Sequence, residues 1–291
     1  MRILLTVSYQ GTAYAGWQRQ KNGPSVQEEI EKAILAGTGQ KIGITGASRT
    51  DAGVHALGQR AHFDIDTTIP PERMPFVLNR FLPRDIRVLS AGEVSPDFHA
   101  RFCAKGKQYC YRIFNSRQGT ALLRDFTYHV PVELDVPAME RAAQYLLGTH
   151  DFKAFCSTGG SAKTTVRTIH EVSLKKEGEV ITFRIRGNAF LYNMVRIIAG
   201  TLVYVGLHKL PENIIGEVLS GGKRVDLGIT APPQGLVLEK VFYDAAEEAG
   251  NGKIFHWVKD AHKMVRYSLL FRFGGCRRCY LHALIYLHRI A

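Results

Sequence analysis

A Gly-rich loop at residues 46–59 holds the side chains best suited to chemistry. It contains Arg49, Asp51 and His55 among glycines that permit unusual backbone angles. A guanidinium two residues before Asp51 would keep that carboxylate ionised, as a nucleophile or general base requires. Spacing alone favours a simpler alternative, an aspartate that caps its own turn. The loop is therefore a candidate site whose chemistry needs support from other residues.

Two further side chains are candidates to complete this site. Tyr109 alternates with Tyr111 along a strand pattern, and Arg196 lies in an apolar helix pattern. On its own pattern, Tyr109 is typical of a core residue with a satisfied hydroxyl. A buried arginine needs a carboxylate partner, and we expect Asp51 to be that partner of Arg196.

Histidine patterns in the chain do not predict a metal or hydrolase site. His55 is a candidate metal ligand with Asp51, but Gly53 argues against a helix that presents both, so we expect a structural histidine. His150-Asp151 has the order of a catalytic dyad, yet no matching Ser or Cys nucleophile accompanies it. We expect this pair to have a structural or substrate-positioning role.

Cysteine usage favours a reducing cytoplasm. Five cysteines, an odd number, do not form a disulfide framework in a chain of 291 residues. Cys276 and Cys279 have the spacing of half a zinc site, but no second pair follows. We therefore expect no bound metal.

Composition is typical of a folded globular protein. Hydrophobic residues make up 45% and charged residues 22%, which excludes a disordered chain. The longest uncharged apolar stretch, residues 197–207, is far shorter than the ~20 residues of a bilayer span, and the chain enters a strand pattern at once. We expect neither a membrane nor a secretory role.

The formal charge of +12 points to a polyanionic partner, but it is unevenly distributed. Residues 252–291 hold eight basic residues and one acid, a net +7, which leaves +5 for residues 1–251. This segment follows an acidic, Gly-containing linker pattern and lacks strand alternation. Three origins remain open for it: a basic RNA-binding extension, an ordinary terminal helix near residues 280–287, or read-through from an altered reading frame.

Hydrophobic periodicity predicts the elements that position the candidate residues. Strands alternate with a period of two, and helices begin at Ser25 and Asp135, residues that cap helix N-termini. We expect strands at 2–9, 42–45, 60–66, 85–94, 108–114, 168–175, 179–186 and 236–243, and helices from 25 to 37, 71–82, 135–148, 190–205 and just after 211.

This order predicts an α+β fold of two successive βαββαβ-like units. We expect each unit to form an antiparallel sheet covered by helices, with a cleft between the two. The first half, residues 1–105, carries the Asp51 loop. The second half is residues 106–245, and residues 246–291 form the basic tail.

The candidate loop also resembles a known signature. Arg49-Thr50-Asp51-Ala52-Gly53-Val54-His55-Ala56, with Gly58-Gln59, is similar to the signature of the TruA-type tRNA pseudouridine synthases. The resemblance continues in order through Tyr9-Gln10-Gly11-Thr12, Gly16-Trp17-Gln18-Arg19-Gln20, Phe98-His99-Ala100-Arg101-Phe102, Tyr109 with Tyr111, His150-Asp151-Phe152, Arg167-Thr168-Ile169, Phe190-Leu191-Tyr192-Asn193-Met194-Val195-Arg196 and Ala231-Pro232-Pro233-Gln234-Gly235-Leu236. It covers roughly residues 1–243 and does not extend into the tail.

The resemblance implies roles for four residues. Asp51 would be the essential aspartate of a pseudouridine synthase fold, the group that starts the conversion of uridine to pseudouridine. Arg49 and Arg196 would pair with it and keep it charged. Tyr109 would lie against the base and assist loss of the C5 proton. Whether the carboxylate attacks C1′, adds to C6 or removes the 2′ proton stays open.

Cationic residues would line the RNA path if the two halves face each other. We expect RNA contacts from Arg19, Gln59, Arg101, Lys105, Lys107, Lys163 and Arg167. The resemblance further implies a homodimer that acts in the cytoplasm on uridines 38, 39 and 40 of the tRNA anticodon stem-loop, with no cofactor or metal. The alternatives are a catalytically silent tRNA-binding module of the same fold and, less consistent with a loop that offers one carboxylate, a metal-dependent nuclease.

Overall fold

Strands dominate the structure, a computed structural model that describes residues 1–160 and 162–244. The predicted tail, with Cys276 and Cys279, lies outside the described residues, and the predicted boundaries at 105 and 245 stay predictions. The strands are β1 (Arg2–Tyr9), β2 (Thr45–Gly46), β3 (His55–Asp64), β4 (Ile86–Val94), β5 (Gly106–Asn115), β6 (Tyr128–Val130), β7 (Gly148–Asp151), β8 (Val166–Glu177), β9 (Val180–Gly187) and β10 (Leu236–Phe242).

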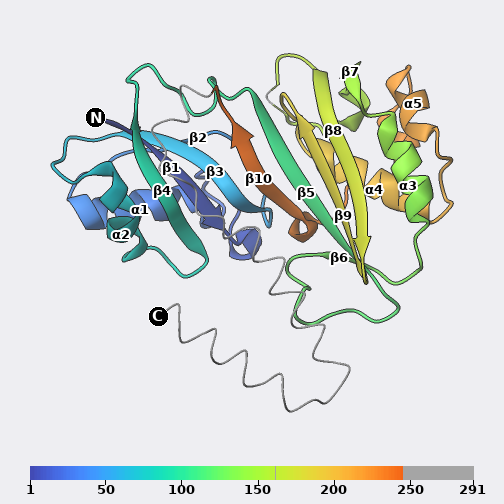
Figure 1. Ribbon diagram of the computed structural model, residues 1–291, viewed down its shortest axis with the longest axis horizontal. Helices are drawn as coiled ribbons and strands as arrows, with labels where there is room; N and C mark the ends of the chain where they lie inside the picture. Colours follow the sequence, from blue (N-terminus) through green and yellow to red (C-terminus); the bar gives the residue numbers. More distant parts are fainter. Residues whose placement is uncertain (161, 245–291) are drawn as a thin grey trace, which may run out of the picture. The chain divides into compact units, whose positions relative to one another are not determined.

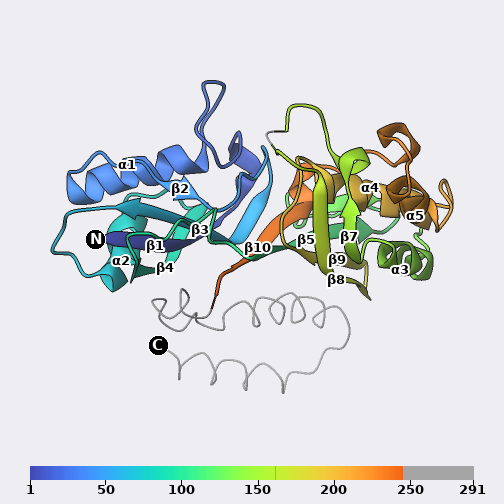
Figure 2. The same cartoon turned by 90° about the horizontal axis from the view of Figure 1, so that it is seen from above.

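Helices pack beside the strands of each half. They are α1 (Val26–Thr38), α2 (Met74–Asn79), α3 (Val136–Gln144), α4 (Met194–Gly206) and α5 (Ile214–Leu219), and short 3₁₀ helices lie at Gly11–Ala13, Pro71–Arg73, Lys153–Phe155, Arg224–Asp226 and Pro233–Gly235. Figures 1 and 2 show α1 and α2 beside the strands of the first half, and α3, α4 and α5 beside those of the second. Among the described residues, no helix has the length and apolar character that crossing a membrane requires.

The strands form a single ten-stranded sheet in the order β4-β1-β3-β10-β5-β9-β8-β7, with β2 on β3 and β6 on β5. Neighbours are antiparallel except at β3–β10 and β5–β6. The predicted α+β class is confirmed. The halves do not form two separate sheets, however, because the last strand, β10, inserts between β3 and β5 and hydrogen-bonds to both.

Ser25 and Asp135 cap helices as expected, but the predicted stops at Gly37 and Gly148 are wrong. Helix α3 ends at Gln144, and Gly148 begins β7. The Ser25 hydroxyl accepts from the Glu28 amide at 3.2 Å, which begins α1. The helix runs past the predicted stop at Gly37 and ends at Gly39, whose φ of 75° is left-handed. Gly37 instead allows a close helix contact, since a Cβ there would lie 2.6 Å from Val77 of α2.

Side-chain hydrogen bonds explain where two predicted elements are shorter than expected. The predicted strand 42–45 shrinks to β2 because Ile44 bonds through its amide to Glu31 and through its carbonyl to Gln27, both on α1. The predicted helix 71–82 becomes a 3₁₀ turn followed by α2, which ends where the Asn79 side chain bonds both main-chain groups of Val88 at 2.8 Å. Both losses follow from long-range contacts.

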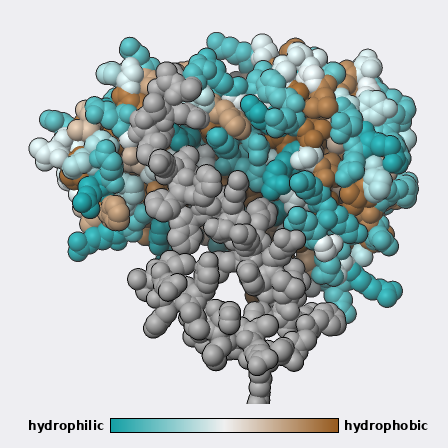
Figure 3. All heavy atoms as spheres, in the orientation of Figure 1, coloured by the Kyte–Doolittle hydropathy of each residue, from teal (hydrophilic) through white to brown (hydrophobic). Residues whose placement is uncertain are grey.

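The apolar core runs along the sheet beneath the helices. Its largest fully buried side chains include Tyr111, Phe152, Phe155 and Phe183. On the face shown in Figure 3, the described residues are mostly hydrophilic, with smaller hydrophobic areas between them. Polar side chains that are buried in this core are therefore unusual and point to a structural or functional role.

Candidate active site

The main chain before Asp51 is clamped from the sheet. Residues 47–54 connect β2 to β3, and the Gln59 side chain of β3 accepts from the Ser48 amide at 3.2 Å and donates to the Ser48 carbonyl at 2.6 Å. Gln59 is fully buried. Gln59 therefore frames the loop, and its expected contact with RNA stays a prediction.

The segment that leads from β1 to α1 holds the middle of the loop. The Tyr9 hydroxyl lies 2.7 Å from the Thr50 hydroxyl, and the Trp17 amide donates to the Thr50 carbonyl at 3.1 Å. The Gly53 amide bonds the Tyr14 carbonyl at 3.3 Å. This packing gives a physical reason for the small residues in the Gly11–Trp17 motif.

Replacing Gly16 by alanine tests that packing. Gly16 has a φ of 109°, and a Cβ there would lie 2.6 Å from the Thr50 carbonyl oxygen. Because this oxygen belongs to the main chain, relieving the clash would displace the loop. We expect Gly16→Ala to lower the free energy of unfolding by about 3 kcal/mol or more, measured by urea denaturation. Gly39→Ala is the matched control, since its φ of 75° is also positive but no atom lies within 4 Å of the added Cβ. Equal losses in the two variants would contradict a tight contact with the loop.

Asp51 and Arg196 meet although 145 positions separate them. Arg196 Nη1 lies 3.5 Å from Asp51 Oδ2, with 25% of the Asp51 side chain and 16% of the Arg196 side chain exposed. Burial raises the pKa of Asp51 above its usual value, and the Arg196 charge and hydrogen bond oppose that rise. The site thus offers a reachable carboxylate whose ionisation depends on one guanidinium.

Arg196 lies in the first turn of α4, where its guanidinium is oriented by hydrogen bonds. Its Nε donates to the Ala231 carbonyl at 2.8 Å, and its Nη1 donates to the Asn193 side chain at 2.8 Å. Asn193 has a left-handed φ of 59°, which explains why the helix begins at Met194 and not at the predicted residue 190. The Asn193 amide in turn donates to the Ser157 hydroxyl at 3.0 Å. The planar guanidinium is therefore fixed before any ligand binds.

Arg49 does not join this pair. It is exposed, and among residues 1–160 and 162–244 the structure forms no ion pair between Arg49 and a carboxylate. The spacing predicted that Arg49 pairs with Asp51, but Asp51 pairs with Arg196. A role for Arg49 in the reaction stays a prediction.

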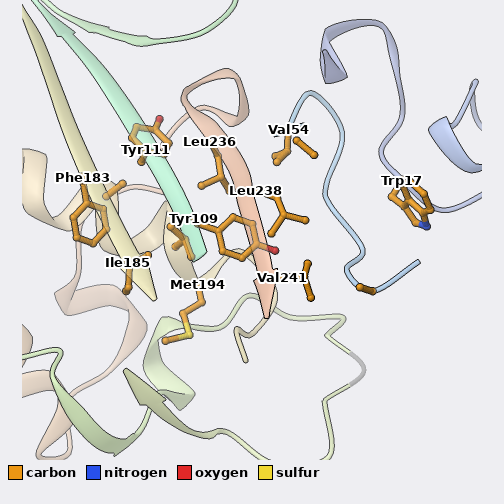
Figure 4. Packing of buried hydrophobic residues seen from close by; sticks show 14 of the residues in the cluster. Trp17, Val54, Tyr109, Tyr111, Phe183, Ile185, Met194, Leu236, Leu238 and Val241 are labelled. Atoms are coloured by element: carbon orange, nitrogen blue, oxygen red, sulfur yellow. The ribbon is translucent and has the colours of Figure 1, made fainter. Parts of the chain in front are cut away.

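Tyr109 lies behind the loop on β5. Its hydroxyl is 2.8 Å from the Ser48 hydroxyl, and its ring packs edge-on against Phe190 with 5.2 Å between centroids. Figure 4 shows the ring beside Leu236 and Leu238 of β10. The Tyr109 pKa is raised to about 12, chiefly by burial. The Ser48 hydrogen bond opposes this rise, and the Asp51 charge adds to it. Tyr109 therefore remains a neutral hydroxyl near the carboxylate.

His55 is structural, as the glycine pattern predicted. Its Nδ1 accepts from the Gly11 amide at 3.0 Å, and its Nε2 donates to the Gln234 carbonyl at 3.1 Å. Burial lowers its pKa, which keeps the ring neutral. His55 thus ties the start of β3 to the 3₁₀ turn before β10.

The expected RNA-contacting residues occupy different environments. Arg101 is exposed, with its guanidinium over the Phe102 ring, and Lys163 is also exposed. Arg19 pairs with Glu31 at 2.9 Å and Lys105 with Asp244 at 3.0 Å, both with more than half of the cationic side chain exposed. These four side chains can approach a polyanion.

Two other predicted contacts lie deeper. Arg167 is half-buried and donates to the Thr164 hydroxyl and the Val166 carbonyl, and burial lowers its pKa. Lys107 points under the loop, where its ammonium donates to the Ala47 carbonyl at 2.9 Å. Contacts of either residue with RNA stay predictions, and the position of Lys107 favours another role.

Sequence reasoning missed the residues that hold the charged groups. Ser48, Asn193 and Ala231 bond Tyr109 or Arg196, and Thr50 anchors the loop. Each of these residues lies within or next to a motif described above, so the motifs indicated the region but not the individual residues. Their individual bonds depend on contacts between distant segments.

Comparison with known proteins gives consistent matches. A family model described as tRNA pseudouridine synthase matches residues 5–103 and 142–244, which include Asp51 and Arg196. The chain is 53% identical over 241 residues to tRNA pseudouridine synthase A of Acetivibrio thermocellus, covering 83% of this chain and 99% of that protein. It is 47% identical over 241 residues to tRNA pseudouridine synthase A of Thermoanaerobacter pseudethanolicus, with coverage of 83% and 99%. It is 48% identical over 237 residues to tRNA pseudouridine synthase A of Halalkalibacterium halodurans, covering 81% of this chain and 90% of that protein.

Proposed function

The chain belongs to the tRNA pseudouridine synthase family, and we propose that it converts uridine to pseudouridine at positions 38, 39 and 40 of the tRNA anticodon stem-loop. The observation that carries this proposal is the partly exposed Asp51 carboxylate, 3.5 Å from a prepositioned Arg196. We propose that Asp51 is the single catalytic aspartate and that the enzyme is a cytoplasmic homodimer that embraces one tRNA.

The reaction is an isomerisation and needs no co-substrate. The bond from C1′ to N1 of uracil breaks, the base rotates, and a bond from C1′ to C5 forms. C5 then loses a proton and N1 gains one, so the atoms balance. Attack at C1′, addition to C6 and removal of the 2′ proton all begin with an ionised carboxylate. The Arg196 charge favours that ionised form of Asp51.

Tyr109 complements the carboxylate in this proposal. Its hydroxyl lies 2.8 Å from the Ser48 hydroxyl, and its flat aromatic ring is of the kind against which a base stacks. With a pKa of about 12, its hydroxyl is a hydrogen-bond partner and is not a phenolate at neutral pH. We propose that it orients the rotating uracil and, once the base has bound, relays the C5 proton by passing on its own hydroxyl proton as it accepts the one from C5.

Binding energy from the rest of the tRNA must precede chemistry. Taking a base out of its stack costs about a few kcal/mol. The exposed cations Arg19, Arg101 and Lys105 are candidates to supply phosphate contacts, which position RNA without reading its sequence. Their contribution should weaken as salt rises.

One experiment separates this function from its alternatives. Incubating the full chain in EDTA with tRNA tritiated at uridine C5 should release tritium without cutting the strand. Stem-loops with cytidine at position 38, 39 or 40, singly and together, then report the sites, and the triple variant should release none. Strand cutting would indicate a nuclease, and tight binding without release would indicate a silent module. Release from the triple variant would overturn the proposed positions.

A further inference from the structure

Lys107 is a cation whose side chain reaches the main chain of the Asp51 loop. It lies on β5 two positions before Tyr109, so both side chains point to the same face of the sheet. Its Nζ donates to the Ala47 carbonyl at 2.9 Å and to the Ser48 hydroxyl at 3.4 Å. The same Ser48 hydroxyl lies 2.8 Å from the Tyr109 hydroxyl. One ammonium group therefore contacts the loop main chain and, through Ser48, the tyrosine.

Lys107 is half-buried, and withdrawing its ammonium from water without a counter-charge costs free energy. Within the described part of the chain, no carboxylate pairs with it. An apolar side chain of similar length would avoid the cost of desolvating the ammonium. A half-buried cation that has no carboxylate partner among the described residues and that contacts the loop carrying Asp51 points to a functional role.

We propose that Lys107 is a positioning residue of the synthase, whose ammonium group fixes Ala47 and Ser48 and thereby orients the Tyr109 hydroxyl toward the base held by Asp51. This inference deepens the proposed function and rests on it. The other contacts of this part of the loop come from Gln59, which holds the Ser48 main chain. Gln59 does not contact the Ser48 hydroxyl, which lies between the Lys107 ammonium and the Tyr109 hydroxyl.

The charge state of Lys107 adds a pH-dependent signature. Burial, followed by the charge of Arg101, lowers the Lys107 pKa to about 8. The other titratable group that contacts the Ser48 hydroxyl is Tyr109, with a pKa of about 12, and the Asp51 charge acts on that tyrosine. Loss of the Lys107 proton above about pH 8 replaces charge-assisted hydrogen bonds by weaker neutral ones.

The test compares Lys107→Met, Lys107→Arg and Ser48→Ala in the tritium-release assay. We expect Lys107→Met to lower kcat by about 10-fold to 100-fold and to leave KM and the Kd for tRNA within about twofold. The control is Lys176→Met, an exposed lysine near the end of β8 that loses the same charge. Combining Lys107→Met with Ser48→Ala should cost little more than Ser48→Ala alone, because both act through one hydroxyl.

The pH profile provides the second measurement. The wild-type kcat should fall above about pH 8, whereas Lys107→Arg should keep its rate there because a guanidinium stays protonated. An unchanged kcat in Lys107→Met, a raised Kd with kcat preserved, or additive losses with Ser48→Ala would each overturn the inference. If Lys107→Met does not fold, the pH profile still tests the inference. A fall in kcat above about pH 8 in Lys107→Arg as well as in wild type would then overturn it. An inactive wild type would instead overturn the proposed function.

Discussion

Asp51→Asn should reduce turnover by at least about 10³-fold, which corresponds to about 4 kcal/mol of transition-state stabilisation. The amide has the shape of the carboxylate but cannot ionise, so none of the three possible first steps can begin. The Kd for tRNA should stay within about threefold, because the lost group is a single anion that does not contact phosphate. Single-turnover tritium release and filter binding at fixed salt measure the two quantities.

Stability provides the control for this variant. Because burial raises the Asp51 pKa, the ionised side chain at neutral pH costs folding free energy relative to the unfolded chain. Asp51→Asn removes that charge, so the variant should melt no lower than wild type. Asp66→Asn, at an exposed aspartate, should keep full activity. Release above about a tenth of the wild-type rate in Asp51→Asn would contradict the catalytic assignment.

Local pattern predicted most elements of the fold. Strand β1 has the predicted bounds, and the hairpin of β8 and β9 turns at Gly178, whose φ is 59°. These features depend on alternation and turn chemistry within a few residues. The insertion of β10 between β3 and β5 depends on pairing between segments more than a hundred positions apart. No local pattern carries that information.

The candidate site divides in the same way. Residue type and motif order were sufficient to single out Asp51, Tyr109 and Arg196. Both ring nitrogens of His55 hydrogen-bond the main chain, which fits the structural role expected for it. Spacing failed for Arg49, because proximity along the chain does not fix the direction of an exposed side chain. The burial of Gln59 was not predictable from the sequence either, because it depends on how the loop folds back on β3.

Arg196→Met should lower kcat by at least about 10²-fold and shift the acid limb of the rate profile to higher pH. Wild-type activity should fall as the pH drops through the raised pKa of Asp51, because protonation removes the reactive form. Arg196 is the group that opposes the effect of burial on that pKa. Its removal leaves desolvation unopposed, so protonation of Asp51 and loss of rate should begin at a higher pH. A pH series of single-turnover rates measures both effects.

Two comparison variants separate the charge of Arg196 from its geometry. Arg196→Lys keeps the charge but cannot hold Ala231, Asn193 and Asp51 together, so its acid limb should stay near wild type while kcat falls. Arg184→Met breaks the partly buried ion pair with Glu239 and should lower stability without moving the limb. An acid limb in Arg196→Met that stays in place or moves to lower pH would contradict control of Asp51 by Arg196. The direction of that shift is therefore the sharpest test of the paired charges, because a purely structural arginine would lower the rate at every pH alike.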